Sequence, residues 1–387
     1  MVENKKKVIH MVTSSGSVNL MKGQLNYLVK AGYDVTVVTS PGAGLYEAIR
    51  RENVKLKEIK MERTIHPLKD FFALIKIIFF FLKVKPDICN AGTPKAGLLG
   101  MIAAKITRVP FKVYTVRGMP LESTRGIKRR ILMKTEKIAC MCADKVVCIS
   151  PSLREALIKY KITYYEKTVL FGKGSSNGLQ LSNYKFTNEM AEKINEIRTQ
   201  HKLNKYNFIV GSVGRINKDK GIKEAILAFE NLQKKCDNVC LILVGVKEKN
   251  NAISNEINDR IVNNPDIIEV GKVKNPIPYY YLMDVLIFPT YREGFGNVSI
   301  EAQATGTPVI TTNVTGAKDT IIPNETGYLI DVRSVASLEN AITEFIENPD
   351  LSERLGGKGK EWVSQNFNSE LIWNNLNELY KNGTVSK

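Results

Sequence analysis

Short apolar runs rich in β-branched residues alternate with segments of helical periodicity along the whole chain. Six runs stand in the first half: KVIHMV (7–12), DVTVVT (34–39), VKLKEI (54–59), DICNA (87–91), FKVYTV (111–116) and KVVCIS (145–150). Five stand in the second half: NFIVGSV (207–213), VCLILVG (239–245), DIIEVG (266–271), VLIFPT (285–290) and PVITT (308–312). This rhythm is typical of βαβ units, in which helices join parallel strands. It predicts an α/β protein with two Rossmann-like domains.

A polar stretch separates the two series of predicted strands. Residues 174–187 read GSSNGLQLSNYKFT, and Ser, Asn and Gly at this density are typical of an interdomain linker. We expect a first domain over residues 1–180 and a second domain over residues 181–368, facing each other across a cleft.

The C-terminal segment, residues 369–387, predicts a final helix. Its apolar residues recur at helical spacing: Leu371, Trp373, Leu376, Leu379 and Tyr380. We expect this helix to pack back on the first domain.

Composition narrows the class of protein. A length of 387 residues suffices for two domains, and 43% apolar with 25% charged residues is ordinary for a globular protein. The six cysteines lie mostly in apolar stretches and the start of the chain has no apolar signal segment, so we expect a reduced cytoplasm. Cys140 and Cys142 lack the paired ligands of a zinc site, and we expect no bound metal.

The net charge of +17 is concentrated in one half of the chain. Residues 1–180 carry 32 Lys and Arg against 13 Asp and Glu, a balance of +19. The remaining residues carry 24 basic and 26 acidic side chains, a balance of −2. This asymmetry indicates that the first domain faces a polyanion, either nucleic acid or an anionic membrane surface.

The longest apolar run, residues 71–82 (FFALIKIIFFFL), is too short to span a bilayer. Lysines interrupt or flank it: Lys69, Lys76, Lys83 and Lys85. With these cations beside its phenylalanines, the segment has the composition of a helix that lies at a membrane interface. The alternative is a core helix whose lysines reach solvent at its rim.

The segment YREGFGNVSIE (291–301) follows the predicted strand 285–290 and is the strongest candidate for a ligand site. Gly294 and Gly296 let the backbone approach a ligand, and a helix that opens after them directs N–H groups toward it. Glu293 and Glu301 lie eight positions apart, so both carboxylates can face the carboxyl end of the strand. This arrangement suits the hydroxyls of a ribose and a hexose.

A second motif, GRINKDKG (214–221), follows the predicted strand 207–213. Arg215 contributes a fork of N–H donors and Lys220 a compact ammonium, which together suit a diphosphate. Alone, the motif is also compatible with a solvated loop. Its combination with the motif at 291–301 favours a binding site.

Three strand ends of the first domain carry polar residues. Gly16 and Ser17 follow the strand 7–12, without the Gly-x-Gly-x-x-Gly fingerprint of dinucleotide sites. Thr93 and Lys95 follow the strand 87–91, and Arg117 follows the strand 111–116. These residues line one edge of the predicted sheet.

With these motifs in place, the chain resembles the retaining glycosyltransferases of family 4, which have the GT-B fold, and among them the bacterial capsular and surface polysaccharide transferases. The resemblance covers nearly the whole chain and is most specific at 291–301. The matching segments are VTSSGS, LVKAGYDVTVVTSPG, MERTIHPLKD, TPKAGLLGMIAAK, YTVRG, CISPSLRE, GKGSSNG, GRINKDKG, YREGFGNVSIEAQATGTPVITTNVTGAKD and NETGYLI.

The resemblance implies a UDP-sugar site in the second domain. Glu301 would hold the ribose, Arg215 and Lys220 would neutralise the diphosphate, and Val273 would lie near the base. One turn would contact the hexose and the distal phosphate: Glu293, Gly294, Phe295, Gly296, Asn297 and Val298.

The resemblance also implies roles for the first domain. Gly16 and Ser17 would complete the donor phosphate site, while Thr93, Lys95 and Arg117 would lie on the acceptor side. Many relatives carry His where this chain has Arg117, so the role of that position here would be charge stabilisation.

The expected chemistry follows from the charge that develops in the reaction. Cleavage of the anomeric C–O bond builds negative charge on UDP, which the preorganised cations Arg215 and Lys220 stabilise. The chain has no Asp-x-Asp motif, so we expect a reaction without metal or cofactor. The resemblance implies retention, by a front-face displacement in which the leaving phosphate helps to deprotonate the acceptor.

The expected function is transfer of a hexose or N-acetylhexosamine-type sugar to a lipid-linked (polyprenyl diphosphate) saccharide in capsule or surface polysaccharide synthesis. The enzyme would be peripheral on the inner face of the cell membrane, with its basic domain toward the anionic surface. One alternative is a UDP-sugar epimerase or hydrolase of the same fold, which needs no acceptor. A remote alternative is a nucleic-acid-binding protein, for which the chain has no recognisable motif.

Overall fold

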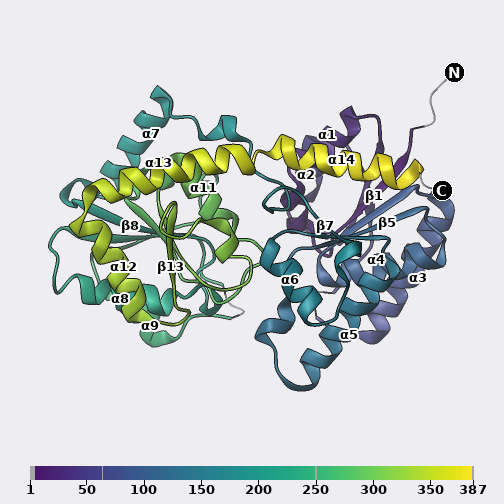
Figure 1. The fold of residues 1–387 in the computed structure, drawn as a ribbon, viewed down its shortest axis with the longest axis horizontal. Helices are drawn as coiled ribbons and strands as arrows, with labels where there is room; N and C mark the ends of the chain where they lie inside the picture. Colours follow the sequence, from purple (N-terminus) through teal and green to yellow (C-terminus); the bar gives the residue numbers. More distant parts are fainter. Residues whose placement is uncertain (1–4, 63, 249–250, 386–387) are drawn as a thin grey trace. The chain divides into compact units, whose positions relative to one another are not determined.

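The computed structural model describes residues 5–62, 64–248 and 251–385, which form two compact units. The first unit comprises residues 1–178 together with 369–387, and the second comprises residues 179–368. Each is built on its own parallel sheet with helices on both faces (Figure 1). The predicted α/β architecture is therefore confirmed.

The first unit contains a sheet of seven parallel strands. In spatial order they are β3 (Lys55–Glu58), β2 (Asp34–Thr39), β1 (Lys7–Met11), β4 (Ile88–Gly92), β5 (Phe111–Val116), β6 (Lys145–Cys148) and β7 (Thr168–Leu170). The order reverses between β1 and β4. In open α/β sheets, ligands bind at the carboxyl ends of the strands beside such a reversal.

Helices cover both faces of this sheet. One face packs against α1 (Gln24–Lys30), α2 (Leu45–Glu52) and α14 (Ser369–Val385). The other carries α3 (Pro67–Val84), α4 (Pro94–Ile106) and α5 (Gly126–Cys142), while α6 (Pro151–Lys159) packs beside β6 and β7. The 3-10 helices η1 (Ser15–Met21) and η2 (Pro120–Ser123) lie in loops.

The final helix, α14, packs on the first unit, as predicted. Trp373 Nε1 donates to Asn177 Oδ1 over 2.8 Å, and Tyr33 donates to Asn377 Oδ1 over 3.0 Å. Tyr380 is fully buried against the sheet.

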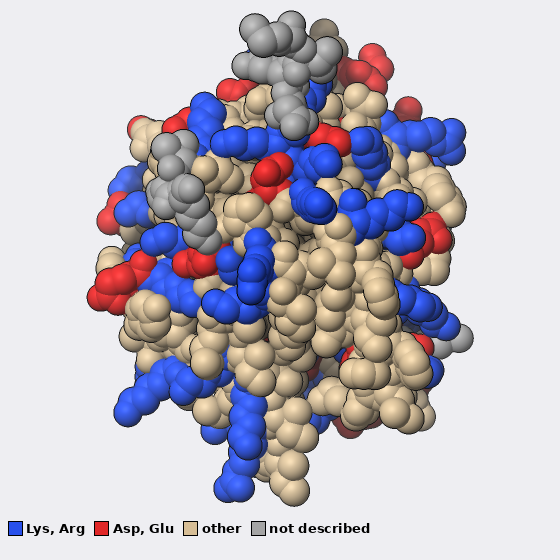
Figure 2. All heavy atoms as spheres, turned by 90° about the vertical axis from the view of Figure 1, so that its right-hand side faces the viewer, with Lys and Arg blue, Asp and Glu red and all other residues tan. Residues whose placement is uncertain are grey.

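The helix α3 has a buried side and an exposed side. Ala73, Ile77 and Phe81 are buried, and α3 packs against α4, whereas Phe72 and Phe79 are more than half exposed. Contact of residues 71–82 with a membrane stays a prediction. The end of the molecule on which α3 lies shows blue Lys and Arg bordering a tan area (Figure 2). Within the described residues, no helix is long and apolar enough to cross a bilayer.

The second unit contains a sheet of six parallel strands, again with a reversal of order. In spatial order they are β10 (Ile267–Gly271), β9 (Val239–Val244), β8 (Phe208–Val213), β11 (Val285–Phe288), β12 (Val309–Thr312) and β13 (Gly327–Ile330). The reversal lies between β8 and β11. Sequence reasoning missed β7 and β13, which are edge strands of three and four residues.

Two helical layers enclose this second sheet. One core cluster joins it to α8 (Ile222–Leu232), α9 (Asn255–Asn263), α12 (Val335–Glu347) and α13 (Pro349–Asn366). The other joins it to α7 (Asn188–Gln200), α10 (Ile277–Leu282) and α11 (Asn297–Thr305).

One glycine holds the loop after β8 against the end of β11. Gly221 has φ +68°, and a Cβ placed there would lie 1.9 Å from the carbonyl oxygen of Pro289. Only glycine permits this left-handed backbone and this close approach together. The two loops at the reversal are therefore locked side by side.

Candidate functional site

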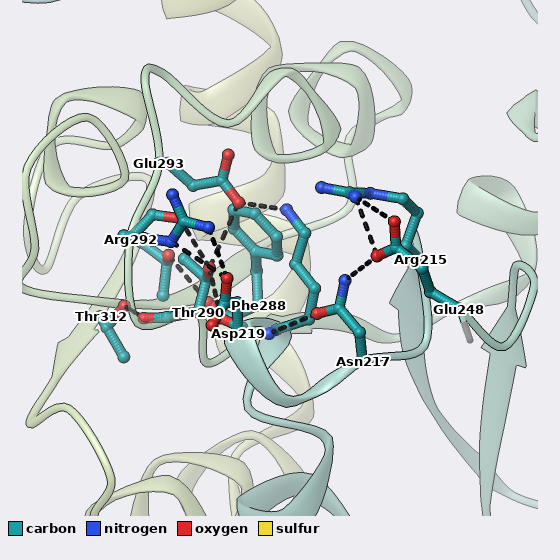
Figure 3. A network of polar contacts seen from close by, with 11 residues as sticks. Arg215, Asn217, Asp219, Glu248, Phe288, Thr290, Arg292, Glu293 and Thr312 are labelled. Carbon is teal, nitrogen blue, oxygen red and sulfur yellow. Dashed lines mark hydrogen bonds and ion pairs between the residues drawn. The ribbon is translucent and has the colours of Figure 1, made fainter. Parts of the chain in front are cut away.

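The loops that follow β8 and β11 bring together residues more than 70 positions apart in the chain. The first loop carries Arg215 and Lys220, and the second carries Glu293. Figure 3 shows Arg215 and Glu293 on these two loops. Because β8 and β11 are neighbours in the sheet, these side chains meet at the carboxyl edge beside the reversal of strand order.

The Lys220 ammonium forms an ion pair with the Glu293 carboxylate. Their side chains are 18% and 17% exposed, so the pair is largely withdrawn from water yet open on one side. The ammonium also lies 4.8 Å from the centre of the Phe288 ring, and Thr290 donates to Glu293 Oε1 over 3.2 Å. Both charges are thus held in place by their surroundings.

A second ion pair fastens the two loops to each other. The Arg292 guanidinium donates from Nε and Nη2 to Asp219 Oδ2, over 3.0 and 2.7 Å. The Tyr291 N–H donates to the Asp219 carbonyl oxygen over 2.8 Å, and Thr290 Oγ1 lies 3.1 Å from the same oxygen. These contacts give the Lys220 and Glu293 pair a stiff support.

Arg215 is paired with a different carboxylate. Its Nη1 donates to both oxygens of Glu248, over 2.8 and 2.9 Å, and its side chain is 62% exposed. Asn217 connects the two cations, because its Nδ2 donates to Glu248 and its Oδ1 accepts the N–H of Lys220. Asn217 also caps the 3-10 helix η6 (Lys218–Lys220), which aims the lysine.

Glu301 lies on α11, where it is partly buried, and it belongs to neither of these pairs. The Tyr280 hydroxyl donates to Glu301 Oε2 over 2.7 Å. Burial raises the pKa of Glu301, and the hydrogen bond from Tyr280 lowers it. Burial and the charge of Glu301 together raise the pKa of Tyr184, in the 3-10 helix η4 (Leu181–Tyr184). Glu301 therefore sits in a desolvated setting that includes both tyrosines.

The turn between Glu293 and α11 has two parts of different character. Phe295 is buried and packs on Phe367, with ring centres 5.3 Å apart, so its side chain belongs to the core. Gly296 has φ +94° and starts α11 directly before Asn297 and Val298. Backbone N–H groups at a helix N-terminus favour an anion.

A further glycine supports this turn, and sequence reasoning missed it. A Cβ on Gly316 would lie 2.6 Å from the carbonyl carbon and oxygen of Gly294. The loop after β12 therefore presses on the backbone of the turn.

Val273 lies between β10 and α10, in the wall of a pocket of about 740 Å³. The opposite wall of this pocket is formed by α7. Glu301 does not line it.

In the first unit, Gly16 and Ser17 lie in η1, directly beyond β1. Nothing stands within 4 Å of the position that a Cβ on Gly16 would take, and Ser17 Oγ is 2.9 Å from Ser14 Oγ. Thr93 has φ +72°, and its hydroxyl lies 2.7 Å from that of Thr13, where it also accepts the Thr13 N–H. The ends of β1 and β4 are joined by these bonds.

Lys95 and Arg117 have opposite surroundings. The Lys95 ammonium donates to both Asp70 oxygens, over 2.6 and 2.7 Å, and to the Thr64 carbonyl oxygen. Arg117 Nε and Nη1 are buried and have no hydrogen-bond partner within the described part of the chain. Burial lowers the pKa of Arg117 to about 10, which leaves the guanidinium charged at neutral pH. Lys95 is thus paired with Asp70 of α3, whereas two N–H donors of Arg117 have no acceptor among the described residues.

A neutral network lies behind Arg117. Tyr380 of α14 is 3.1 Å from His10 Nε2 and accepts from Asn90 Nδ2 over 2.7 Å, and Thr115 donates to Asn90 Oδ1 over 2.8 Å. Burial and the charge of Arg117 lower the pKa of His10 to about 3. His10 is therefore neutral, and this network supplies no negative charge to Arg117.

Of the predicted site residues, Lys220 and Glu293 form an ion pair, and Arg215 is linked to them through Glu248 and Asn217. Glu301 is hydrogen-bonded to Tyr280 instead. Sequence reasoning missed Asn217, Tyr280 and Glu248, because nothing in their local sequence distinguishes them. Within the described residues, no three His, Cys, Asp or Glu side chains gather as metal ligands.

Two protein families match the chain. Residues 14–169 match Glycosyltransferase Family 4, and residues 193–362 match Glycosyl transferases group 1. A Staphylococcus aureus protein named capsular polysaccharide biosynthesis glycosyltransferase CapM is 42% identical over 97% of this chain and 96% of its own length. An Escherichia coli protein named UDP-Gal:alpha-D-GlcNAc-diphosphoundecaprenol alpha-1,3-galactosyltransferase is 26% identical over 84% of this chain and 83% of its own length.

Solved structures share the fold. Anabaena HepE in complex with UDP-glucose superposes with a TM-score of 0.81 at 20% identity, over 97% of this chain and 99% of that one. A glycosyltransferase from Rickettsia africae gives a TM-score of 0.81 at 21% identity, over 98% and 99%. The two Rossmann-like sheets are those of the GT-B fold.

Proposed function

The chain belongs to glycosyltransferase family 4, and we propose that it transfers a hexose or N-acetylhexosamine-type sugar from a UDP-sugar to a lipid-linked saccharide, with retention of configuration. The observation that supports the proposal is the ion pair of Lys220 with Glu293. This pair lies at the reversal of strand order in the second sheet and is partly accessible to solvent.

In this proposal, the second unit binds the donor. The Glu301 carboxylate accepts the ribose hydroxyls, and Val273 lies near the base. Lys220, Arg215 and the N–H groups around Gly294, Gly296, Asn297 and Val298 receive the diphosphate and the hexose. Gly16 and Ser17 contribute from the first unit, while Phe295 acts by anchoring the turn to the core.

Donor binding exchanges the partners of the two cations. The diphosphate takes the place of the Glu293 carboxylate on Lys220 and of the Glu248 carboxylate on Arg215. Glu293 keeps its bond from Thr290 and turns to the hexose hydroxyls.

Transfer then follows from the charge that develops. The bond between the anomeric carbon and the phosphate oxygen breaks, and its electron pair leaves with UDP. Lys220 and Arg215 stabilise this negative charge, which is larger in the transition state than in the bound donor. The acceptor hydroxyl oxygen bonds to the anomeric carbon on the same face, and its proton passes to the departing phosphate oxygen.

The acceptor is proposed to be a polyprenyl diphosphate saccharide in capsule or surface polysaccharide synthesis, at the inner face of the cell membrane. The names of the S. aureus and E. coli relatives and the +19 charge of residues 1–180 support this. Thr93 and Arg117 are the proposed contacts on the acceptor side. Lys95 acts there by holding α3 through Asp70.

The test is a product assay with a panel of UDP-sugars and polyprenyl diphosphate saccharides in detergent, analysed by mass spectrometry. We expect UDP release together with an acceptor heavier by one sugar. Release of free sugar or of an epimer, with no effect of the acceptor, would overturn the proposal in favour of a hydrolase or an epimerase.

A further inference from the structure

The outer side of α3 is an apolar stripe. Ala73, Ile77 and Phe81 form the buried side of the helix. Five large apolar side chains stand exposed along the rest of the helix: Leu68 (77%), Phe71 (57%), Phe72 (62%), Phe79 (68%) and Leu82 (52%). The spacing 68, 72, 79, 82 follows one face of a helix. Scattered exposed apolar residues are normal, but a continuous row indicates a partner.

A second stripe runs along α5. Glu136, Ala139 and Cys140 are buried, whereas the outer side exposes Ile127 (75%), Ile131 (40%), Ile138 (42%) and Met141 (65%). Between the two stripes lies α4, which packs against both α3 and α5. The three helices therefore present one surface of the first unit with two apolar ridges. We name it the α3–α5 face.

The α3–α5 face is strongly basic. The three helices contain ten Lys and Arg and two acidic residues, a balance of +8 over their ranges. Lys69, Lys76 and Lys83 recur every seven residues and so form a line beside the apolar stripe of α3. The view of this end of the molecule shows Lys and Arg bordering the uncharged area (Figure 2).

Neither acidic residue offsets this charge at the surface. Asp70 is paired with Lys95, and both side chains are less than one fifth exposed. Glu136 is buried and accepts the Tyr114 hydroxyl over 2.7 Å. Lys69 forms a further ion pair, with Glu62 just before α3, over 3.1 Å. Most of the other lysines and arginines of the three helices are exposed beside the apolar ridges.

We propose that the α3–α5 face docks on an anionic lipid bilayer, with its apolar ridges in the interface and its cations on the headgroups. Apolar side chains bordered by Lys and Arg have the composition of an interfacial surface. A second copy of the chain is disfavoured because it would bring two surfaces of the same sign together.

Both α3 and α5 begin at the sheet edge that carries Thr93 and Arg117, so docking brings this edge to the membrane.

This inference rests on the proposed function only in its purpose, which is to bring the enzyme to a lipid-linked acceptor. Binding is measured without transfer, by flotation with vesicles of phosphatidylcholine alone or with roughly one third phosphatidylglycerol. The apolar variant is Phe72→Glu/Phe79→Glu, and its control is Val262→Glu, an equally exposed apolar position on α9. The charge variant is Lys76→Glu/Lys83→Glu, and its control is Lys223→Glu/Lys234→Glu in the second unit.

We expect the wild type to float with anionic vesicles at low salt and to bind neutral vesicles about tenfold more weakly. Both α3 variants should lose about tenfold or more of the anionic binding, while both controls bind as the wild type. Circular dichroism and thermal unfolding check that every variant is folded, whether or not the protein binds UDP.

Three results would overturn the docking proposal. The first is a wild type that does not bind anionic vesicles. The second is α3 variants that bind these vesicles as well as their controls do. The third is a concentration-dependent dimer that Phe72→Glu/Phe79→Glu abolishes without changing vesicle binding. Failure of the proposed function looks different, because the protein would then bind vesicles without transferring sugar to an acceptor in detergent.

Discussion

Replacing Tyr280 with Phe tests whether the partly buried Glu301 carboxylate holds the donor in its ionised form. The Tyr280 hydroxyl donates to Glu301 over 2.7 Å and opposes the effect of burial on the pKa of that carboxyl. A hydrogen bond to a charged group contributes about 1.5–3 kcal/mol. Tyr280→Phe should therefore raise the pKa of Glu301 further.

The sign of the effect on activity follows directly. Protonation removes the charge that accepts the ribose hydroxyls, so activity falls as the pH falls through the pKa of Glu301. In Tyr280→Phe this acid limb should move to higher pH, and KM for the UDP-sugar should rise about tenfold at neutral pH.

The assay is kcat/KM for the UDP-sugar between pH 5 and 9, with Tyr279→Phe as the control. Tyr279 is also a buried tyrosine of α10, but its hydroxyl is not the donor to Glu301. Glu301→Ala sets the limit, with turnover lowered by orders of magnitude at every pH. If the acid limb of Tyr280→Phe coincides with that of Tyr279→Phe, the reasoning about Glu301 is wrong.

Three further predictions follow from other parts of the structure. Lys220→Ala should lower kcat by about 10²–10³-fold while circular dichroism stays unchanged, and wild-type turnover would remove the lysine from the proposed site. Gly221→Ala should destabilise the fold by about 1–3 kcal/mol in urea unfolding, because its Cβ would meet the Pro289 carbonyl in a left-handed backbone; unchanged stability would contradict the lock between the loops. Burial raises the pKa of Glu136 to about 7, so its contribution to stability is fully present below about pH 4.5 and is lost as the pH rises through 7. Glu136→Gln keeps an acceptor for Tyr114 and should be more stable than the wild type at pH 8 but not at pH 5, and equal pH dependence in the two proteins would refute this.

The fold was largely predictable because its signals are local. Runs of β-branched residues between helical segments identified eleven of the strands, and the residues of α14 carried their own periodicity. The edge strands β7 and β13 escaped because three or four residues bordered by polar positions resemble a loop. Neither strand lies beside the reversal of order, so the prediction of the site did not depend on them.

Local sequence was also enough to nominate Lys220, Glu293 and Glu301, since glycine-bounded turns after strands mark ligand sites. It could not pair them. The ion pair of Lys220 with Glu293 spans 73 residues and exists because β8 and β11 are neighbours, a long-range choice of strand order. The bond of Tyr280 to Glu301 likewise depends on how α10 packs on α11.

In the first unit, too, local sequence and tertiary packing determine different properties. The net charge and the apolar segment follow from the residues alone, and they indicated a polyanionic partner but not the surface that binds it. Only packing decided that Ala73, Ile77 and Phe81 are buried while Phe72 and Phe79 are exposed. Packing also decided that Lys95 is bound to Asp70, whereas two donors of Arg117 are buried without an acceptor among the described residues. Composition and periodicity set which side chains are available, but burial and pairing are made by contacts between distant segments, and these decide which charges are neutralised and which remain for a ligand.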